Sequence, residues 1–195
     1  MNISNKRQNK FNLINYRGRK LTFLIAFVFF ATSTYAQSWN EVIKASVSKP
    51  DPGSEFGGSV SIFGNWAIVG SKYDGFDENE NNHERYAGSA YIFKKNSEGN
   101  WIQKQKICGA KRYSDQFFGC SVSISDKYAI VGAFGKGLTN PKQKYNAFKI
   151  KAGAAYIFEK NSDGVWKETQ RLNASEIGSL HKFGYSVSIS GEYAI

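Results

Sequence analysis

The sequence contains three copies of one unit, and this internal repeat limits the fold more than any other feature. Residues 56–62 (FGGSVSI) recur as residues 118–124 (FGCSVSI) and 183–189 (FGYSVSI), at intervals of 62 and 65 residues. In each copy an Ala-Ile pair begins 11 residues after the Phe. A repeat of this kind indicates similar structural units that pack side by side.

Each complete unit contains four segments with the pattern of a β-strand. Ser-Val-Ser-Ile alternates small and bulky side chains, as in a strand with one apolar face. Residues 66–70 and 88–93 are apolar almost throughout, which is expected where a strand is covered on both faces. The fourth segment, residues 101–107 (WIQKQKI), is mostly polar, so we expect it at an exposed edge. The Asn-Ser-Glu-Gly turn before it is typical of a hairpin.

Four antiparallel strands per unit, with buried inner strands and a polar outer strand, are typical of β-propeller blades. A β-sandwich is the alternative, but it does not predict similar units at a near-constant interval. We therefore expect an all-β fold built from propeller blades of four antiparallel strands. Blade 1 is predicted at residues 56–107, blade 2 at residues 118–172 and the start of blade 3 at residues 183–195.

Residues 37–55 precede the first full unit and contain Trp39, which lies as far before its Phe-Gly pair as Trp101 does. This spacing predicts that residues 37–55 supply an outer strand, which completes the last blade and latches the ring of blades. The third copy stops at Ile195, where the earlier copies continue with Val-Gly. We therefore expect an incomplete propeller, a fragment whose remaining blades belong to a longer chain.

Residues 1–36 have the features of a secretory signal peptide. Six Lys and Arg residues without any acid accompany the apolar run 21–30 (LTFLIAFVFF), and small residues precede the predicted cleavage site before Gln37. The apolar run is shorter than the roughly 20 residues that a membrane-spanning helix needs. We expect a secreted or cell-surface protein without a membrane span after signal cleavage; an uncleaved membrane anchor is the alternative.

The net charge argues against nucleic acid as a partner. The whole chain carries a formal charge of +10, but six of its 26 Lys and Arg residues lie in the predicted signal. The exported chain therefore carries only about +4. So small an excess gives no ground for binding to DNA or RNA.

These repeats resemble the FG-GAP repeat family, whose units form the blades of integrin-α-type propellers and also occur in secreted bacterial surface proteins. The three Phe-Gly pairs and the Tyr-Ile-Phe segments at residues 91–93 and 156–158 carry the resemblance. It implies extracellular adhesion or ligand binding, and many blades of the family hold Ca²⁺ in an Asp-rich loop between strands one and two. The corresponding turns here, residues 63–65 and 125–127, lack the series of acids that Ca²⁺ needs, so we expect no cofactor.

In a propeller, the loops between strands two and three share one face with the connections between blades, and the resemblance places a ligand on this face. The first such loop, residues 71–86, is acidic, and the second, residues 133–151, is basic. The candidate ligand-binding residues are Asp74, Asp77, Glu78, Lys136, Lys142, Lys144 and Tyr145. As alternatives, both loops are merely solvated or pair with each other, or the three acids bind a cation weakly.

Cys108 and Cys120 are the only cysteines in a chain that we expect in an oxidising compartment. They are a candidate disulfide, but no other copy of the repeat has Cys at these positions, so two free thiols are the alternative. His83 and His181 have no partner at catalytic or zinc spacing and are expected in exposed loops. A tryptophan recurs at one position of the repeat, as Trp39, Trp101 and Trp166. This recurrence indicates a role in packing rather than stacking on carbohydrate.

No nucleophile–base pair, carboxylate pair or phosphate-binding loop stands out in the sequence. The leading hypothesis is therefore a non-catalytic, exported propeller module that binds an extracellular protein or glycan. Two alternatives to this hypothesis stay open. In the first, the chain is the N-terminal propeller of a secreted carbohydrate-active enzyme whose catalytic part lies elsewhere. In the second, it is a structural spacer in a surface protein.

Overall fold

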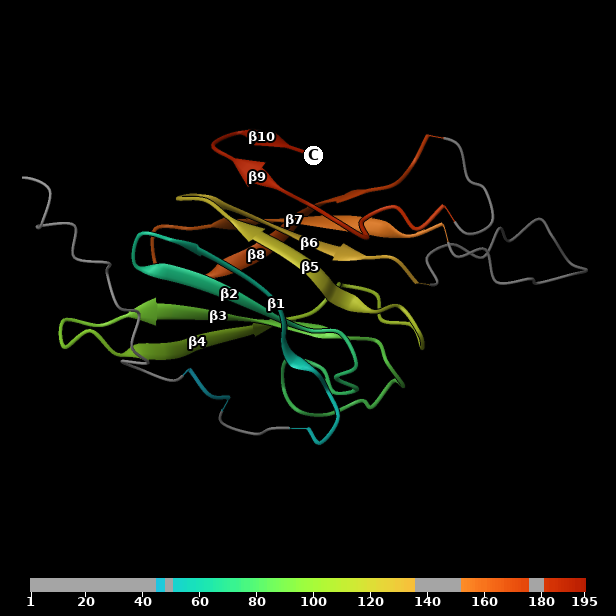
Figure 1. Cartoon of the computed structure of the whole chain (residues 1–195), viewed down its shortest axis with the longest axis horizontal. Helices are drawn as coiled ribbons and strands as arrows, with labels where there is room; N and C mark the ends of the chain where they lie inside the picture. Colours follow the sequence, from blue (N-terminus) through green and yellow to red (C-terminus); the bar gives the residue numbers. More distant parts are fainter. Residues whose placement is uncertain (1–44, 48–50, 136–151, 176–180) are drawn as a thin grey trace, which may run out of the picture. The chain divides into compact units, whose positions relative to one another are not determined.

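The computed structural model describes residues 45–47, 51–135, 152–175 and 181–195. These residues form two four-stranded antiparallel sheets and a short hairpin (Figure 1). The first sheet contains β1 (Phe56–Phe63), β2 (Trp66–Ser71), β3 (Ser89–Lys95) and β4 (Trp101–Ile107). The second contains β5 (Phe118–Ile124), β6 (Tyr128–Ala133), β7 (Ala154–Lys160) and β8 (Trp166–Leu172). The hairpin contains β9 (Ile189–Ser190) and β10 (Tyr193–Ala194).

Each sheet keeps its strands in chain order, so that every strand pairs with the one that follows it. The described part of the chain contains no helix, and thus none that could cross a membrane. The sheets do not close into a ring. The prediction of an all-β fold with incomplete propeller blades of four antiparallel strands is confirmed.

A bulge at the start of the first strand explains the Phe-Gly pair. The register shifts between Phe56 and Ser59 in β1 and between Phe118 and Ser121 in β5. Gly57, which lies in the first bulge, has a φ of 93°, a backbone conformation that residues other than glycine rarely adopt. The repeated Phe-Gly pair therefore encodes the same irregularity in both sheets.

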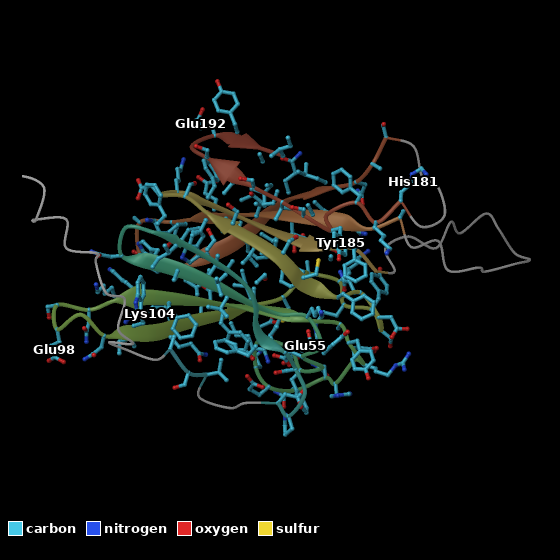
Figure 2. All side chains as sticks on the ribbon, in the orientation of Figure 1. Glu55, Glu98, Lys104, His181, Tyr185 and Glu192 are labelled. Carbon is cyan, nitrogen blue, oxygen red and sulfur yellow. The ribbon has the colours of Figure 1, made fainter. Side chains whose placement is uncertain are left out.

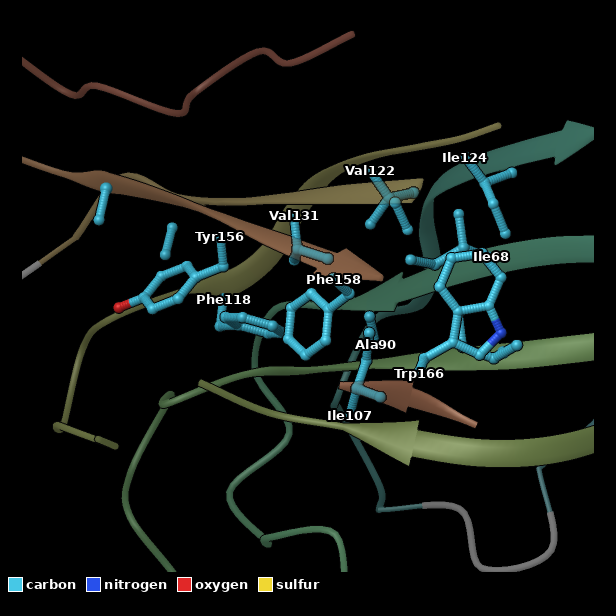
Figure 3. Close-up of a cluster of buried hydrophobic side chains, with 14 residues drawn as sticks. Ile68, Ala90, Ile107, Phe118, Val122, Ile124, Val131, Tyr156, Phe158 and Trp166 are labelled. Carbon is cyan, nitrogen blue, oxygen red and sulfur yellow. The ribbon is translucent and has the colours of Figure 1, made fainter. Parts of the chain in front are cut away.

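The main hydrophobic core lies between blades 1 and 2 (Figure 3). Blade 1 contributes what we call its isoleucine face, which consists of Ile68, Ala90, Ile92 and Ile107. Blade 2 contributes its aromatic face, which consists of Phe118, Val122, Ile124, Val131, Tyr156, Phe158 and Trp166. Small branched side chains on one sheet thus fill the spaces between rings on the other.

The same two faces recur on the other sides of the blades. The isoleucine face of blade 2 packs against residues of the third repeat in a cluster that includes Ile130, Ala155, Ile157, Leu172, Phe183, Val187 and Ile189. The aromatic face of blade 1 consists of Phe56, Val60, Ile62, Ala67, Val69, Tyr91, Phe93 and Trp101, and Ala45 and Val47 pack against part of it. Each blade therefore offers its isoleucine face to the aromatic face of the next. The outer strand predicted within residues 37–55 lies largely outside the described residues and stays a prediction.

The blades also touch through backbone and serine side chains. Ser59 Oγ donates a hydrogen bond to the carbonyl oxygen of Gly119 at 2.8 Å, and Ser121 Oγ does the same to Gly184 at 2.9 Å. The amide of Ile124 donates to Ser61 Oγ at 3.2 Å. The small residues of the Ser-Val-Ser-Ile pattern therefore hydrogen-bond to the next blade. The bulky residues lie on the opposite face of the strand, where Val122 and Ile124 of blade 2 are buried in the core.

The prediction of an exposed outer strand is right in the middle of β4 and wrong at its end. Ile102 and Lys104 are exposed, but Lys106 and Ile107 are buried. Trp166, at the start of β8, is also buried and packs edge-on against Trp66 of blade 1, with ring centroids 5.7 Å apart. The predicted packing role of the repeated tryptophan is confirmed at this position, whereas Trp39 lies outside the described residues.

Candidate binding surface at the loop face

Two connections lie together at one end of the sheets, and we call them the loop face: residues 72–88, between β2 and β3, and residues 108–117, between β4 and β5. The amide of Phe117 donates to the carbonyl oxygen of Tyr86 at 3.0 Å. Arg85 forms an ion pair of 2.8 Å with Asp115. The hairpin between β3 and β4, which contains Glu98, lies at the opposite end of blade 1. In Figure 2 Glu98 is far from Tyr185. The predicted meeting of these two connections on one face is confirmed.

A buried charge cluster anchors residues 72–88. The side chains of Asp74 and Lys106 are only 1% and 3% exposed, and their charged groups lie 3.0 Å apart. Asp74 also accepts hydrogen bonds of 2.6 Å from Ser89 Oγ and from the hydroxyl of Tyr91. Lys106 has a second partner in Glu80, at 3.1 Å. The prediction that Asp74 faces a ligand is therefore wrong, because every polar group around it belongs to the protein's own sheet and loop.

The surroundings of Asp74 hold it ionised. Burial alone would raise the pKa of its carboxyl group, but hydrogen bonds from Ser89, Tyr91, the amide of Phe76 and Lys106 outweigh burial and lower the pKa below its ordinary value. Burial, followed by the neighbouring Asp74 carboxylate, raises the pKa of Tyr91. At neutral pH the cluster therefore contains a carboxylate and a protonated phenol.

Asp77 is also buried and turned inward, which corrects the second candidate. Its carboxylate accepts hydrogen bonds from the amides of Asn79 and Asn81, at 2.9 and 2.8 Å, and from Nδ2 of Asn82 at 2.6 Å. The hydrogen bond from the Asn81 amide is the main reason why the pKa of Asp77 lies below its ordinary value. Asp77 thus shapes the loop and does not offer its charge to a partner.

The remaining candidates divide into one exposed residue and a group that lies outside the described residues. Glu78 is exposed on the loop. The structure does not bring Asp74, Asp77 and Glu78 together; within the described ranges no three His, Cys, Asp or Glu side chains are placed to hold a metal ion. The other candidates, which lie outside the described residues, are Lys136, Lys142, Lys144 and Tyr145.

Five aromatic rings form a continuous row across the loop ends of the three repeats, and we call it the aromatic row: Tyr73, Tyr86, Phe117, Phe134 and Tyr185. Successive ring centroids lie 4.9 Å apart from Tyr73 to Tyr86 and 6.2 Å from Tyr86 to Phe117. Phe117 stacks on Phe134 at 4.9 Å, and Phe134 contacts Tyr185 at 5.2 Å. Each step is within the range of a favourable aromatic contact.

The aromatic row is partly open to solvent and has cations along it. Tyr86 is 41% exposed and Tyr185 is 62% exposed. Lys72 lies over the ring of Tyr73 at 4.9 Å, Arg85 over Tyr86 at 5.1 Å and Lys182 over Tyr185 at 5.7 Å. On such a surface a ligand can stack on the faces of the aromatic rings and form hydrogen bonds with the tyrosine hydroxyl groups. The neighbouring cations supply positive charge.

Backbone geometry at two members of the aromatic row is unfavourable. Tyr86 and Phe117 have φ values of 54° and 56°, which are uncommon for bulky side chains. Conformations of this kind persist only where surrounding contacts enforce them. The positive φ of Phe117 is also a feature of the repeat, because Glu55 and Lys182, which precede the other Phe-Gly pairs, have φ values of 53° and 50°. For Tyr86 and Phe117, the backbone hydrogen bond between the two residues and the stacking of their rings supply those contacts.

Sequence reasoning did not find the aromatic row because its members occupy different positions of the repeat. Tyr73 and Tyr86 flank one loop, Phe117 precedes β5, Phe134 follows β6 and Tyr185 lies after the third Phe-Gly pair. No periodic signal connects them. The histidines are exposed as predicted, and His83 packs edge-on against Phe76 at 4.9 Å.

Cys108 and Cys120 are free thiols in the structure, so the candidate disulfide is not formed. Their sulfur atoms point to different neighbours: Cys108 Sγ lies 3.9 Å from the carbonyl oxygen of Phe76, and Cys120 Sγ lies 3.4 Å from that of Gly184. Burial raises the pKa of Cys108 to about 12 and also raises the pKa of Cys120.

Both thiols are therefore expected to react slowly with a thiol reagent in the folded chain, because the reactive thiolate is scarce at neutral pH. Titration with a chromogenic disulfide reagent, with and without denaturant, measures this. We expect slow reaction in buffer and two thiols per chain in denaturant without reductant. A denatured chain with no titratable thiol would instead establish the disulfide.

Comparison with known proteins agrees with the arrangement of the sheets. The family model of the FG-GAP repeat matches residues 39–93 and 101–158, which together make up more than half of the chain. Each match begins at a tryptophan, Trp39 or Trp101, and ends in the third strand of a blade, at Phe93 of β3 or Phe158 of β7. The search of curated proteins found no match. On the strength of these two matches and the paired four-stranded sheets, the chain belongs to the FG-GAP repeat family.

Proposed function

We propose that this chain is an extracellular, non-catalytic binding module that holds a protein or glycan ligand at its loop face. The single observation that carries the proposal is the aromatic row. Tyrosine and arginine dominate the binding energy of many interfaces, and Tyr86, Tyr185 and Arg85 lie exposed on this row or beside it. The predicted signal peptide supports an extracellular location.

The buried charge cluster supports the same site by fixing its shape. The amide of Gly88 donates to the carbonyl oxygen of Asp74 at 2.8 Å, while the Asp74 side chain binds β3 and β4 residues. Both ends of the 72–88 loop are thereby held, and with them Tyr73 and Tyr86. A rigid surface loses less conformational entropy when a ligand binds.

Removal of two exposed rings tests the proposal. The double variant Tyr86→Ala with Tyr185→Ala is expected to bind its ligand about 10-fold more weakly or worse, because truncation of a central interface tyrosine often costs more than about 1 kcal/mol. Binding is measured against immobilised neutral, uronate-containing and sulfated polysaccharides and against extracellular matrix proteins. Circular dichroism establishes that the fold persists.

Tyr113→Ala provides the matched control. Tyr113 is 42% exposed and belongs to the same loop face, but its ring is not part of the aromatic row. The control is expected to bind as the unaltered chain does. Equal binding by all three proteins would exclude the aromatic row as the site. Turnover of a polysaccharide would favour the propeller of a carbohydrate-active enzyme, and the absence of both binding and turnover would favour a spacer.

A further inference from the structure

The side chain of Arg85 is held in one position on the loop face although it is 65% exposed. Its Nη2 donates hydrogen bonds to both carboxylate oxygens of Asp115, at 2.8 and 3.1 Å. The guanidinium group also lies over the ring of Tyr86, 5.1 Å from the ring centroid. The backbone supports the same position, because the amide of Asp115 donates to the carbonyl oxygen of Arg85 at 2.8 Å. One carboxylate and one aromatic ring therefore fix this cation.

The contacts of Arg85 use only one of the three nitrogen atoms of its guanidinium group. Nε and Nη1 have no hydrogen-bond partner among the residues that the structure describes. N–H donors of a guanidinium group bind carboxylates strongly, because the hydrogen bond joins opposite charges. Since the side chain is already held in place, it loses less conformational entropy when a second carboxylate binds. Arg85 is therefore a preformed receptor for an anionic group.

The ring faces in the middle of the aromatic row are occupied by groups of the protein itself. Tyr86 and Phe134 stack on Phe117, with interplanar angles of 23° and 19°. Arg85 lies over the ring of Tyr86, and Lys182 lies over that of Phe134 at 6.0 Å. Stacking by a ligand is therefore left to the ends of the row, and the three middle rings meet a ligand at their edges.

Ring edges and the guanidinium group favour the same kind of ligand. An aromatic ring carries partial positive charge along its edge and partial negative charge on its faces. The weakly positive C–H groups of a sugar are attracted to ring faces and not to ring edges. Carboxylates, peptide carbonyl oxygens and the faces of other aromatic rings are attracted to the edges. The middle of the aromatic row therefore favours a polypeptide with acidic and aromatic side chains over a glycan.

The acidic residues beside Arg85 leave room for a further carboxylate. Glu84, which precedes Arg85, accepts a hydrogen bond of 2.8 Å from Ser114 Oγ. Asp115 is bound by Nη2 alone, so a partner's carboxylate can use Nε or Nη1 without displacing it. All of these residues lie in the two connections of the loop face, between β2 and β5. The two ends of the sequence take no part in these contacts.

We propose that the ligand of the loop face is an acidic polypeptide segment. One of its carboxylates binds Nε or Nη1 of Arg85, and a neighbouring aromatic side chain packs against the edges of Tyr86 and Phe117. This inference rests on the proposed function, because it requires the aromatic row to be a binding surface. It adds the chemical class of the partner, which is a polypeptide rather than a glycan and acidic rather than basic.

Binding of the chain to four immobilised polymers tests the proposal. A random copolymer of glutamate and tyrosine supplies both acidic and aromatic side chains. Polyglutamate lacks the rings, a copolymer of lysine and tyrosine reverses the charge, and polygalacturonate carries its carboxylates on a glycan. We expect the glutamate–tyrosine copolymer to bind at least about 10-fold more tightly than each of the other three.

Arg85→Gln is expected to bind the glutamate–tyrosine copolymer about 10-fold more weakly, because it loses the charge-assisted hydrogen bonds. Lys111→Gln is the matched control, since Lys111 is an exposed cation of the same loop face and its removal changes the net charge equally. The control is expected to stay within about 2-fold of the unaltered chain. Circular dichroism checks that both variants fold, which we expect because the Arg85–Asp115 pair is exposed.

The outcomes separate this inference from the proposed function. The acidic polypeptide is refuted if the chain binds polygalacturonate or the lysine–tyrosine copolymer as tightly, or if it binds none of the four polymers. It is also refuted if Arg85→Gln and Lys111→Gln bind alike. In these cases the aromatic row stays the site if the double variant Tyr86→Ala with Tyr185→Ala loses binding to a polysaccharide or matrix protein. If that double variant binds every probe as the unaltered chain does, both proposals fail.

Discussion

Gly70→Ala is expected to destabilise the chain by about 3 kcal/mol or more, which is the upper part of the range for overpacked cores. A Cβ at this position would overlap the carbonyl oxygen of Gly119 in the next blade and the hydroxyl of Ser59. Rotation of a side chain cannot relieve a clash with backbone, so blades 1 and 2 would have to separate. In a strand without such a contact the same change usually stabilises, because alanine loses less backbone entropy than glycine.

Unfolding in urea or on heating measures the effect. For a chain of this size, about 3 kcal/mol corresponds to a fall of roughly 10 °C in Tm. Gly132→Ala should act in the same direction, since its Cβ would overlap the carbonyl oxygen of Gly184.

Gly58→Ala is the control for this prediction. The other repeats have Cys120 and Tyr185 at this position, which shows that the backbone there accepts a side chain. A Cβ on Gly58 would lie 3.2 Å from the carbonyl oxygen of Glu55, which a small shift accommodates. We expect a change within about 1 kcal/mol. If Gly70→Ala were as stable as Gly58→Ala, the close approach of the two blades would be refuted.

Asp74→Ala is expected to lower the free energy of unfolding by about 3–5 kcal/mol, the range for removal of one partner from a buried ion pair. The change leaves Lys106 buried with Glu80 as its remaining partner and removes the acceptor of the hydrogen bonds from Ser89 and Tyr91. Lys106→Met should cost less, because Asp74 keeps its three other donors. Asp126→Ala breaks an exposed pair with Lys160 and is expected to cost less than about 1 kcal/mol.

The pH dependence of stability tests whether Asp74 is ionised. Its pKa is lower in the folded chain than in the unfolded chain, where it lies near 3.9. The folded state therefore binds the proton less readily, and the stabilisation is fully present above about pH 4. It is lost as the pH falls through the folded-state pKa. The stability difference between the unaltered chain and Asp74→Asn should thus be constant near neutral pH and shrink in acid. A difference that does not change with pH would show that Asp74 is not ionised in the folded chain.

The strands were predictable because the sequence pattern of each strand occurs in more than one copy of the repeat. The Phe-Gly pair marks the bulge of β1 and again that of β5, and Ser-Val-Ser-Ile separates core residues from those that hydrogen-bond to the next blade. The turns and the inner strands followed from the same comparison. Local pattern and propensity agree with the final structure at these positions, which is why the sequence was informative there.

The loop face was less predictable because its contacts join residues that no repeat relates. Asp74 in the first loop looks like a solvated acid, and Lys106 looks like an exposed residue of an edge strand, until the fold places them 3.0 Å apart. Burial of a charge is favourable only when a partner is present, and the partner here is more than 30 residues away. The aromatic row joins residues of three repeats. It could not be predicted from the sequence either, because its rings meet only in the folded chain.

By itself the sequence determined the class of fold and the number and order of strands in each blade. These properties depend on side-chain periodicity and turn chemistry, which are local. Only the tertiary structure decided which polar residues are buried, that Cys108 and Cys120 are free thiols and which rings meet at the loop face. It also showed that the aromatic face of blade 1 is open while the identical pattern in blade 2 is closed. The physical reason is that a side chain becomes buried only when a second surface packs against it. A sequence pattern describes the surface that carries the side chain and not the surface that covers it.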